Sequence, residues 1–290
     1  MRRSNWVRSL SNNVGAEIMA DYDYWKKQGV VSIFPEVDTM PPEQRRFAGK
    51  VLIVGGNKNA FFSVASAMVS AQRAGAGEVR VLLPASVKGQ VPMAPEIYFA
   101  AIEKSSGAFG RESVSEMLIQ ADWADVVILI GDVGKNAETT VALADFLRNC
   151  EKPVYATRDA VDAITPEVAD WSMLRGVETG LLLTLPQLQK MLRTLYYPKV
   201  VTLSMPTNQL IEVLHKFTIS YPLIPIVTFH NGQIIVAQDG AVITEALSDT
   251  EWTQITLWGG ALMVKMAVFR IWNASVASYK VFASALLNKS

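Results

Sequence analysis

The pattern of apolar and polar positions predicts a strand, a helix and a second strand between residues 49 and 83. Residues 51–54 form a continuous apolar run that stops at Gly55-Gly56, as expected of a parallel strand covered on both faces. Small residues across 63–73 allow a helix to pack closely on a sheet, and an apolar run resumes at 79–83. The segments form a right-handed crossover, which puts the Gly55-Gly56 loop at the carboxyl end of its strand, where such sheets bind ligands.

Two interpretations of this loop are open. It lacks the GxGxxG fingerprint and the GxxxxGK[ST] phosphate-binding loop, so it is either a ligand-binding loop of another type or a plain tight turn. A second such loop, residues 131–136, lies between a buried strand predicted over 125–130, apolar after Asp125, and a helix predicted over 138–150. Free amides at a helix start favour an anion there, although ordinary strand-to-helix turn chemistry gives the same pattern.

The remaining segments extend the sheet and then reverse its direction. Asn231-Gly232 and Asp239-Gly240 separate three short apolar runs, and both dipeptides supply the positive φ that tight hairpins need. We therefore predict an α/β fold with a mostly parallel central sheet, flanked by helices and finished by a late antiparallel hairpin. The other predicted strands are 97–102, 153–156, 181–185, 200–203, 224–228, 233–237 and 241–244, and the other helices are 113–121, one ending at 195, 208–217 and 261–287 with a break near 273–275.

Residues 1–48 are predicted to be an adaptor in front of an α/β domain that spans 49–290. A helix is predicted over 14–29, closed by Gly29, and a loop rich in proline and charge follows. We expect its aromatic residues to pack on the domain or on a second subunit. They are Tyr22, Tyr24 and Trp25.

Composition narrows the class of protein. Lysine plus arginine and aspartate plus glutamate both number 27, so the net charge is zero and no basic footprint predicts nucleic-acid binding. Cys150 is the only cysteine, which excludes an internal disulfide, and the two histidines, His215 and His230, argue against a metal site. No membrane span or signal peptide is predicted, so we expect a cytoplasmic protein. We also expect it to form a homo-oligomer.

Several motifs together resemble one family. GKVLIVGG is followed at the family's spacing by RAGAG, GKNAET follows DVVILIG, and KPVYATRDAVDAI comes next. From about Pro41 onward the chain resembles the ribokinase-like ADP- or ATP-dependent NAD(P)H-hydrate dehydratases. The resemblance implies a ribokinase-like fold, ADP or ATP with magnesium as cofactors, and a small nucleotide or dinucleotide as ligand.

The resemblance also assigns site positions. Nucleotide contacts fall on Phe229, His230, Asn231, Gly232, Thr256 and Gly259. Substrate contacts fall on Asn57, Ser63, Gly131, Asp132, Gly134, Gln189 and Gly260.

Several of these positions depart from the family's pattern. Ala60-Phe61-Phe62-Ser63 replaces a Tyr-Thr-Gly-Ala turn, and its two rings are expected to fill part of the pocket. The GPGLG loop is shortened to residues 131–134, where the added Asp132 carboxylate would repel phosphate. The DAD segment becomes Thr157-Arg158-Asp159, and Pro186-Gln187-Leu188-Gln189 lacks the histidine and glutamate of HPGE.

The nucleotide segments differ as well. Phe229-His230 replaces Lys-Gly, so a long cation is lost and a histidine is gained. The family's final GSGD or GTGD turn holds phosphate, and its Asp acts on the substrate; Gly260 stands at that Asp position, and Trp258 is expected to crowd the phosphate cradle. Loss of a proton-transfer group costs roughly a hundredfold to ten-thousandfold in rate.

Three hypotheses for function follow. The first is a diverged relative with weak or absent catalysis, which acts as a nucleotide-binding or structural protein. The second is an active dehydratase or a related small-molecule kinase that uses Asp132, Asp159 or His230 as acid or base. The third is an oligomeric interaction scaffold with a filled cleft, in which Trp252, Trp258 and Trp272 face a partner subunit.

Plainer roles compete for three of these features. For Asp159, the candidate catalytic residue, the plainer role is to cap a helix. For His230, the plainer role is that of a surface residue in a hairpin. The apolar residues Met263, Met266, Phe269 and Trp272 recur every three positions, which is typical of core packing.

Overall fold

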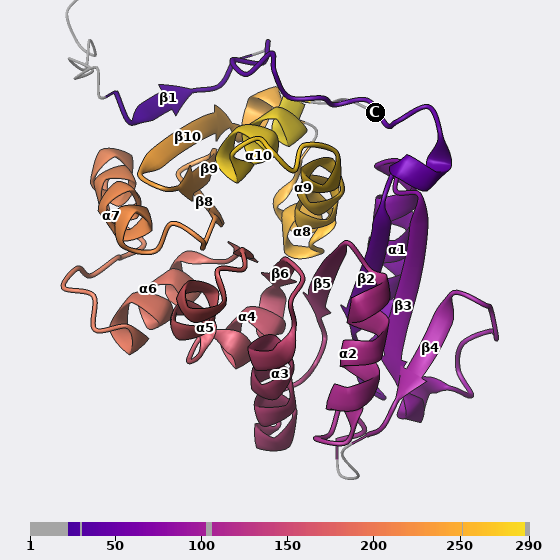
Figure 1. Ribbon diagram of the computed structural model, residues 1–290. Coiled ribbons are helices and arrows are strands. Elements are labelled where there is room, and N and C mark those ends of the chain that lie inside the picture. Colours follow the sequence, from indigo (N-terminus) through magenta and orange to yellow (C-terminus); the bar gives the residue numbers. More distant parts are fainter. Residues whose placement is uncertain (1–22, 30, 103–105, 251, 288–290) are drawn as a thin grey trace, which may run out of the picture.

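The computed structural model describes residues 23–29, 31–102, 106–250 and 252–287. Within them, a ten-stranded sheet has the order β1-β10-β9-β8-β7-β6-β5-β2-β3-β4 (Figure 1). Strands β2 to β8 pair in parallel, β8, β9 and β10 pair antiparallel, and β1 is parallel to β10. The strands are β1 (Trp25–Lys27), β2 (Lys50–Gly55), β3 (Glu78–Pro84), β4 (Ile97–Ala100), β5 (Val126–Gly131), β6 (Val154–Thr157), β7 (Thr179–Leu182), β8 (Ile226–His230), β9 (Gln233–Gln238) and β10 (Ala241–Ala246).

Helices cover both faces of the sheet. The helices are α1 (Phe62–Arg73), α2 (Ser113–Trp123), α3 (Ala137–Asn149), α4 (Arg158–Ile164), α5 (Val168–Arg175), α6 (Leu185–Thr194), α7 (Thr207–Ser220), α8 (Gln254–Trp258), α9 (Ala261–Trp272) and α10 (Ser278–Leu287). Apolar residues from α2 to α7 share one core cluster, and those from α1, α9 and α10 share the other. Both clusters also contain strand residues, so the architecture has three layers.

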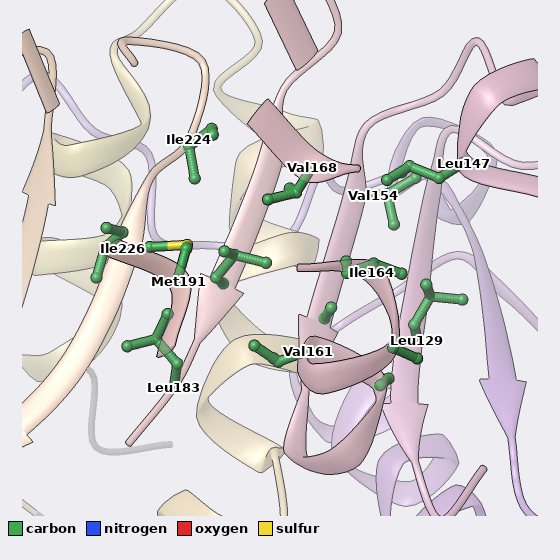
Figure 2. Close-up of a cluster of buried hydrophobic side chains, with 14 of the residues drawn as sticks. Leu129, Leu147, Val154, Val161, Ile164, Val168, Leu183, Met191, Ile224 and Ile226 are labelled. Atoms are coloured by element: carbon green, nitrogen blue, oxygen red, sulfur yellow. The ribbon is translucent and has the colours of Figure 1, made fainter. Parts of the chain in front are cut away.

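The first strand of the crossover shows why a continuous apolar run is needed. Leu52 and Val54 belong to one core cluster, whereas Val51 and Ile53 belong to the other. Successive side chains of a strand point to opposite faces, so a strand covered on both sides must be apolar at every position. Figure 2 shows part of the first cluster, in which β5 and β6 contribute Leu129 and Val154 beside residues of α4, α5 and α6.

The predicted fold class is confirmed, including the hairpins. Asn231 and Gly232 have φ of 47° and 73°, and Asp239 and Gly240 have φ of 48° and 77°, as tight hairpins require. Core packing of Met263, Met266 and Phe269 is also confirmed, since all three are buried. The break predicted near 273–275 separates α9 from α10.

The helix predicted over 14–29 is wrong where the structure describes it, and its first residues, 14–22, lie outside the described part. Trp25–Lys27 form β1 instead, because the edge of β10 offers backbone partners: Val242 N–H donates to Tyr24 O at 2.7 Å, and Gln28 N–H donates to Thr244 O at 2.8 Å. Tyr24 stacks on His215 with ring centres 3.7 Å apart. Both described aromatic residues therefore pack on the domain, while Tyr22 lies outside the described residues.

Other predicted elements need smaller corrections. Residues 200–203 are not a strand but part of the loop between α6 and α7, and β7 pairs directly with β8. The strand predicted at 181–185 is β7 at Thr179–Leu182, because Thr184 caps α6 through a capping box with Gln187. Helix α5 was not predicted. No helix in the described part of the chain is long and apolar enough to span a lipid bilayer.

Candidate functional site

The candidate site lies at the carboxyl ends of β2 and β5, which we call the β2–β5 crevice. From β2 the chain runs outward to β3 and β4, then returns to β5 on the other side of β2. Strand order therefore reverses between β2 and β5, and open α/β sheets bind ligands at such a switch point. Both glycine loops predicted from the sequence leave their strands here.

The two loops are tied to each other at the crevice. Gly56 N–H donates to Gly131 O at 3.0 Å, and the Asn57 amide Nδ2 donates to Asp132 O at 2.6 Å. Asn57 and Ala60 also pair with each other through backbone bonds of 2.8 and 3.2 Å, which makes the first loop a tight turn. The Gly56 amide and the Asn57 side chain, which would approach a ligand, are therefore hydrogen-bonded to the neighbouring loop.

Asp132 is the centre of a polar cluster in the crevice. Its carboxylate accepts hydrogen bonds from the Ser63 hydroxyl and, at 2.5 Å, from Nη2 of Arg158. Asp132 and Arg158 both have φ of +57°, a left-handed conformation that costs a non-glycine residue about 1–3 kcal/mol. The structure thus brings the predicted residues Asn57, Ser63 and Asp132 together, with Arg158 as an added cation.

Asp159 is bound to the second glycine loop. Its Oδ2 accepts a hydrogen bond from Gly134 N–H at 2.8 Å, and its Oδ1 is buried without a hydrogen-bond partner among the described residues. Thr157, not Asp159, is the N-cap of α4, so the helix-cap alternative is wrong. The carboxylate lies where the amides of a glycine loop would receive an anion from outside.

The turn between α8 and α9 closes another side of the β2–β5 crevice. Gly260 is the N-cap of α9 with φ of +82°, and a Cβ added to it would lie 2.6 Å from Ile130 Cδ1 and 3.0 Å from Thr157 Oγ1. Gly259 lies in the same turn, and the Thr256 hydroxyl donates to the carbonyl of Thr253, just before α8. Ile130 and Thr157 thus take up the space beside Gly260, the position to which the resemblance assigns an Asp.

A small cavity remains beside these residues. Its volume is about 40 Å³, and Arg158, Thr184, Gln187, Phe229 and Trp258 are among the residues that line it. Trp258 is half exposed, at 50%, and is one of the lining residues. Gln187 rather than the predicted Gln189 lines it, and the Gln187 amide donates to Arg158 O at 2.7 Å.

Two other expectations are wrong. His230 is 5% exposed rather than a surface residue, and its Nε2 lies 2.6 Å from Met205 O; a carbonyl only accepts, so Nε2 donates. Asn231 donates to the Thr207 hydroxyl at 3.2 Å. Of residues 229–232, Phe229 alone lines the cavity. Phe62 is 83% exposed and fills no pocket, whereas Phe61 packs against the core formed with α1 and α9.

The tryptophans differ in their surroundings. Trp272 donates from Nε1 to Ala48 O at 3.1 Å and stacks on Phe269, so it packs within its own chain rather than being free to face a partner. Trp252 and Trp258 line different cavities. In the part of the chain that the structure describes, no three His, Cys, Asp or Glu side chains gather to hold a metal ion.

The chain has a ribokinase-like α/β fold. A ribokinase-like superfamily protein from Enterococcus faecalis has the same fold, with a TM-score of 0.63, 15% identity, and coverage of 91% of this chain and 86% of that one. The ADP/ATP-dependent NAD(P)H-hydrate dehydratase from Bacillus subtilis, co-crystallised with ATP/Mg²⁺, matches with a TM-score of 0.54 and 13% identity over 86% of this chain and 82% of that one.

The sequence resemblance to NAD(P)H-hydrate repair proteins is confirmed. A bifunctional NAD(P)H-hydrate repair enzyme from Methanothermobacter thermautotrophicus is 30% identical over 141 residues, which cover 43% of this chain and 27% of that enzyme. The chain therefore matches about a quarter of the length of this relative. No protein-family model matches the chain.

The residues at the β2–β5 crevice do not fit a nucleoside triphosphate and its magnesium ion. The Gly134 amide is occupied by Asp159, and Asp132 is occupied by Arg158 and Ser63. The cavity lined by Arg158 and by residues of β7 and β8 holds only about 40 Å³, against roughly 300–1,000 Å³ for typical small-molecule sites. Arg158 thus neutralises a carboxylate of its own chain.

Proposed function

We propose that this protein is a catalytically deficient relative of the NAD(P)H-hydrate dehydratases, which keeps their fold in a structural or ligand-sensing role. One observation carries the proposal: glycine stands where the resemblance requires an acidic residue, and Ile130 and Thr157 occupy the space of its side chain. Glycine can neither donate nor accept the proton that dehydration must transfer. A missing proton-transfer group lowers the rate by about two to four orders of magnitude.

The polar cluster supports the same proposal. A nucleophile, acid or base must be able to reach the substrate, yet Asp132 is held between Arg158 and Ser63, and Asp159 is held by Gly134. Both carboxylates therefore serve contacts within the chain. The crevice acts as a structural junction, at which the loops after β2 and β5 meet the first turn of α4.

The test is a dehydration assay with hydrated NADH and hydrated NADPH, each with ADP or ATP and magnesium. The Bacillus subtilis dehydratase serves as the positive control, and the Asp159→Asn variant as the matched negative control. We expect the wild-type chain to be indistinguishable from Asp159→Asn and from the reaction without protein. Nucleotide-dependent dehydration by the wild type that Asp159→Asn abolishes would overturn the proposal.

A further inference from the structure

A larger cavity lies away from the crevice, between α1 and α9. Its volume is about 440 Å³, against about 40 Å³ for the cavity beside Trp258. This size falls within the range of small-molecule sites. We call it the α1–α9 cavity; Pro41, Arg73, Trp252, Thr256, Lys265 and Phe269 are among its lining residues.

The described polar side chains of the lining are cationic or neutral, and none of the described lining residues is an aspartate or glutamate. Arg73 is exposed in the last turn of α1, and no ion pair in the described part of the chain involves it. Lys265 is only 7% exposed, although it carries an ammonium group. Because no ion pair in the described residues neutralises Arg73, this part of the lining favours a ligand that bears negative charge.

Aromatic surface lies beside these charges. The Lys265 ammonium lies 5.3 Å from the ring centre of Trp252 and 5.8 Å from that of Phe269. The indole Nε1–H of Trp252 is buried and has no hydrogen-bond partner among the described residues. Buried donors in folded proteins nearly always have an acceptor, so this N–H is a vacant position for a ligand oxygen.

The outer wall of the cavity is firmly held. Asn273, which follows α9, accepts from Asp38 N–H and donates to Asp38 O, both at 2.8 Å. Pro41 packs on Gly75, where an added Cβ would lie 2.9 Å from Pro41 Cβ. Residues 39–41 are thus fixed across the space between α1 and α9, and a preformed site loses little conformational entropy when a ligand binds.

We propose that the α1–α9 cavity binds a small planar aromatic molecule that carries one acidic group, such as a carboxylate, sulfonate or phosphate. The ring would lie against Trp252 and Pro41, and the acidic group would interact with Arg73. This site is separate from the β2–β5 crevice and needs no catalysis.

Two dyes test the proposal by fluorescence titration. The probe is 8-anilinonaphthalene-1-sulfonate, and its matched control is N-phenyl-1-naphthylamine, which has the same rings without the sulfonate. Arg73→Gln removes the exposed cation, whereas Arg193→Gln removes an exposed arginine from the corresponding last turn of α6. Trp252→Phe keeps an aromatic ring and deletes the unpaired donor.

We expect saturable binding of the sulfonate dye at one site, weakened about tenfold or more by Arg73→Gln and unchanged by Arg193→Gln. Trp252→Phe should also weaken it, and the neutral dye should bind both arginine variants equally. Equal sulfonate affinity in the two arginine variants, or binding that does not saturate, would overturn the proposal. Urea unfolding of each variant checks that the fold is intact, and a thermal shift with ATP that Arg73→Gln removes would place ATP in this cavity.

Discussion

The carboxylate of Asp159, in the first turn of α4, and the backbone amide of Gly134, in the loop that follows β5, are joined by a hydrogen bond of 2.8 Å. Hydrogen bonds to charged groups contribute about 1.5–3 kcal/mol. Asp159→Ala should therefore lower the free energy of unfolding by about that amount, and Asp159→Asn by less, because its amide oxygen still accepts. The measurement is urea denaturation.

Asp170 gives the matched control for this prediction. It lies in the first turn of α5, as Asp159 lies in the first turn of α4, and it is exposed. Asp170→Ala removes the same interaction with the helix dipole, worth about 0.3–1 kcal/mol, without any bond to a glycine loop. Equal losses for the two alanine variants would show that the Gly134 contact contributes nothing to stability.

Crowding at Gly260 can be separated from backbone strain. Gly260→Ala places a methyl group 2.6 Å from Ile130 Cδ1, whereas Gly176, with φ of +65°, has no heavy atom within 4 Å of the same position. Both substitutions incur the left-handed cost of about 1–2 kcal/mol. Overpacking adds about 1–3 kcal/mol for Gly260→Ala alone, so its urea midpoint should fall further.

The same geometry predicts that activity is not restored by one substitution. Gly260→Asp should be less stable than the wild type and should dehydrate no hydrated NADH, because its side chain has no room beside Thr157. The dehydration assay gives the readout. A stable and active Gly260→Asp variant would show that only the carboxylate is missing.

Cys150 provides a pH-dependent prediction. Burial raises the pKa of the Cys150 thiol from 9.0 to about 11. The folded state therefore holds the proton more tightly than the unfolded state, so the contribution is complete below about pH 9 and is lost as pH rises through about 11. Between these values the loss is about 1.4 kcal/mol per pH unit.

The measurement compares the wild type with Cys150→Ala. The difference in unfolding free energy between them should stay constant up to about pH 9 and then shrink. Other groups titrate equally in both proteins and cancel. A difference that does not change with pH would mean that the thiol is not shielded by the fold.

Glu178 predicts a second stability effect, at the amino end of β7, whereas the crevice lies at the carboxyl ends of its strands. It accepts hydrogen bonds from Tyr155 at 2.5 Å and from Ser278, and its Oε1 lies 3.6 Å from Arg270 Nε. Removing one partner of a largely buried ion pair costs about 3–5 kcal/mol. Glu178→Gln should approach that loss in urea unfolding.

Glu212 supplies the contrast for Glu178. It pairs with Lys216 on the exposed face of α7, where both side chains are more than half exposed. Such a pair contributes about 0.5 kcal/mol or less. Similar costs for Glu178→Gln and Glu212→Gln would argue against a structural role for the buried carboxylate.

The sequence predicted the centre of the sheet better than its margins. Residues 51–54 and 126–130 are apolar at every position because both of their faces are covered, and no other element gives so clear a pattern. By contrast, Trp25–Lys27 become a strand only because β10, more than 200 residues away in the chain, exposes an edge to them. Local propensity carries no information about such a partner.

In the site, the sequence predicted which loops meet but not what their side chains do. Asn57, Ser63 and Asp132 follow strands that the pattern places side by side. Arg158 was missed as the partner of Asp132, since its direction depends on a positive φ that an arginine seldom adopts. Gln187 could have been found, because Thr184-x-x-Gln187 has the spacing of a capping box.

Strand β1 has a consequence for how copies of the chain meet. It is only three residues long, and its Lys26 and Lys27 are exposed. Short, positively charged edge strands do not readily accept a further strand, because neighbouring ammonium groups repel one another and few backbone groups remain to pair. At this edge of the sheet, β1 therefore covers the late hairpin and opposes the addition of a strand from another copy of the chain.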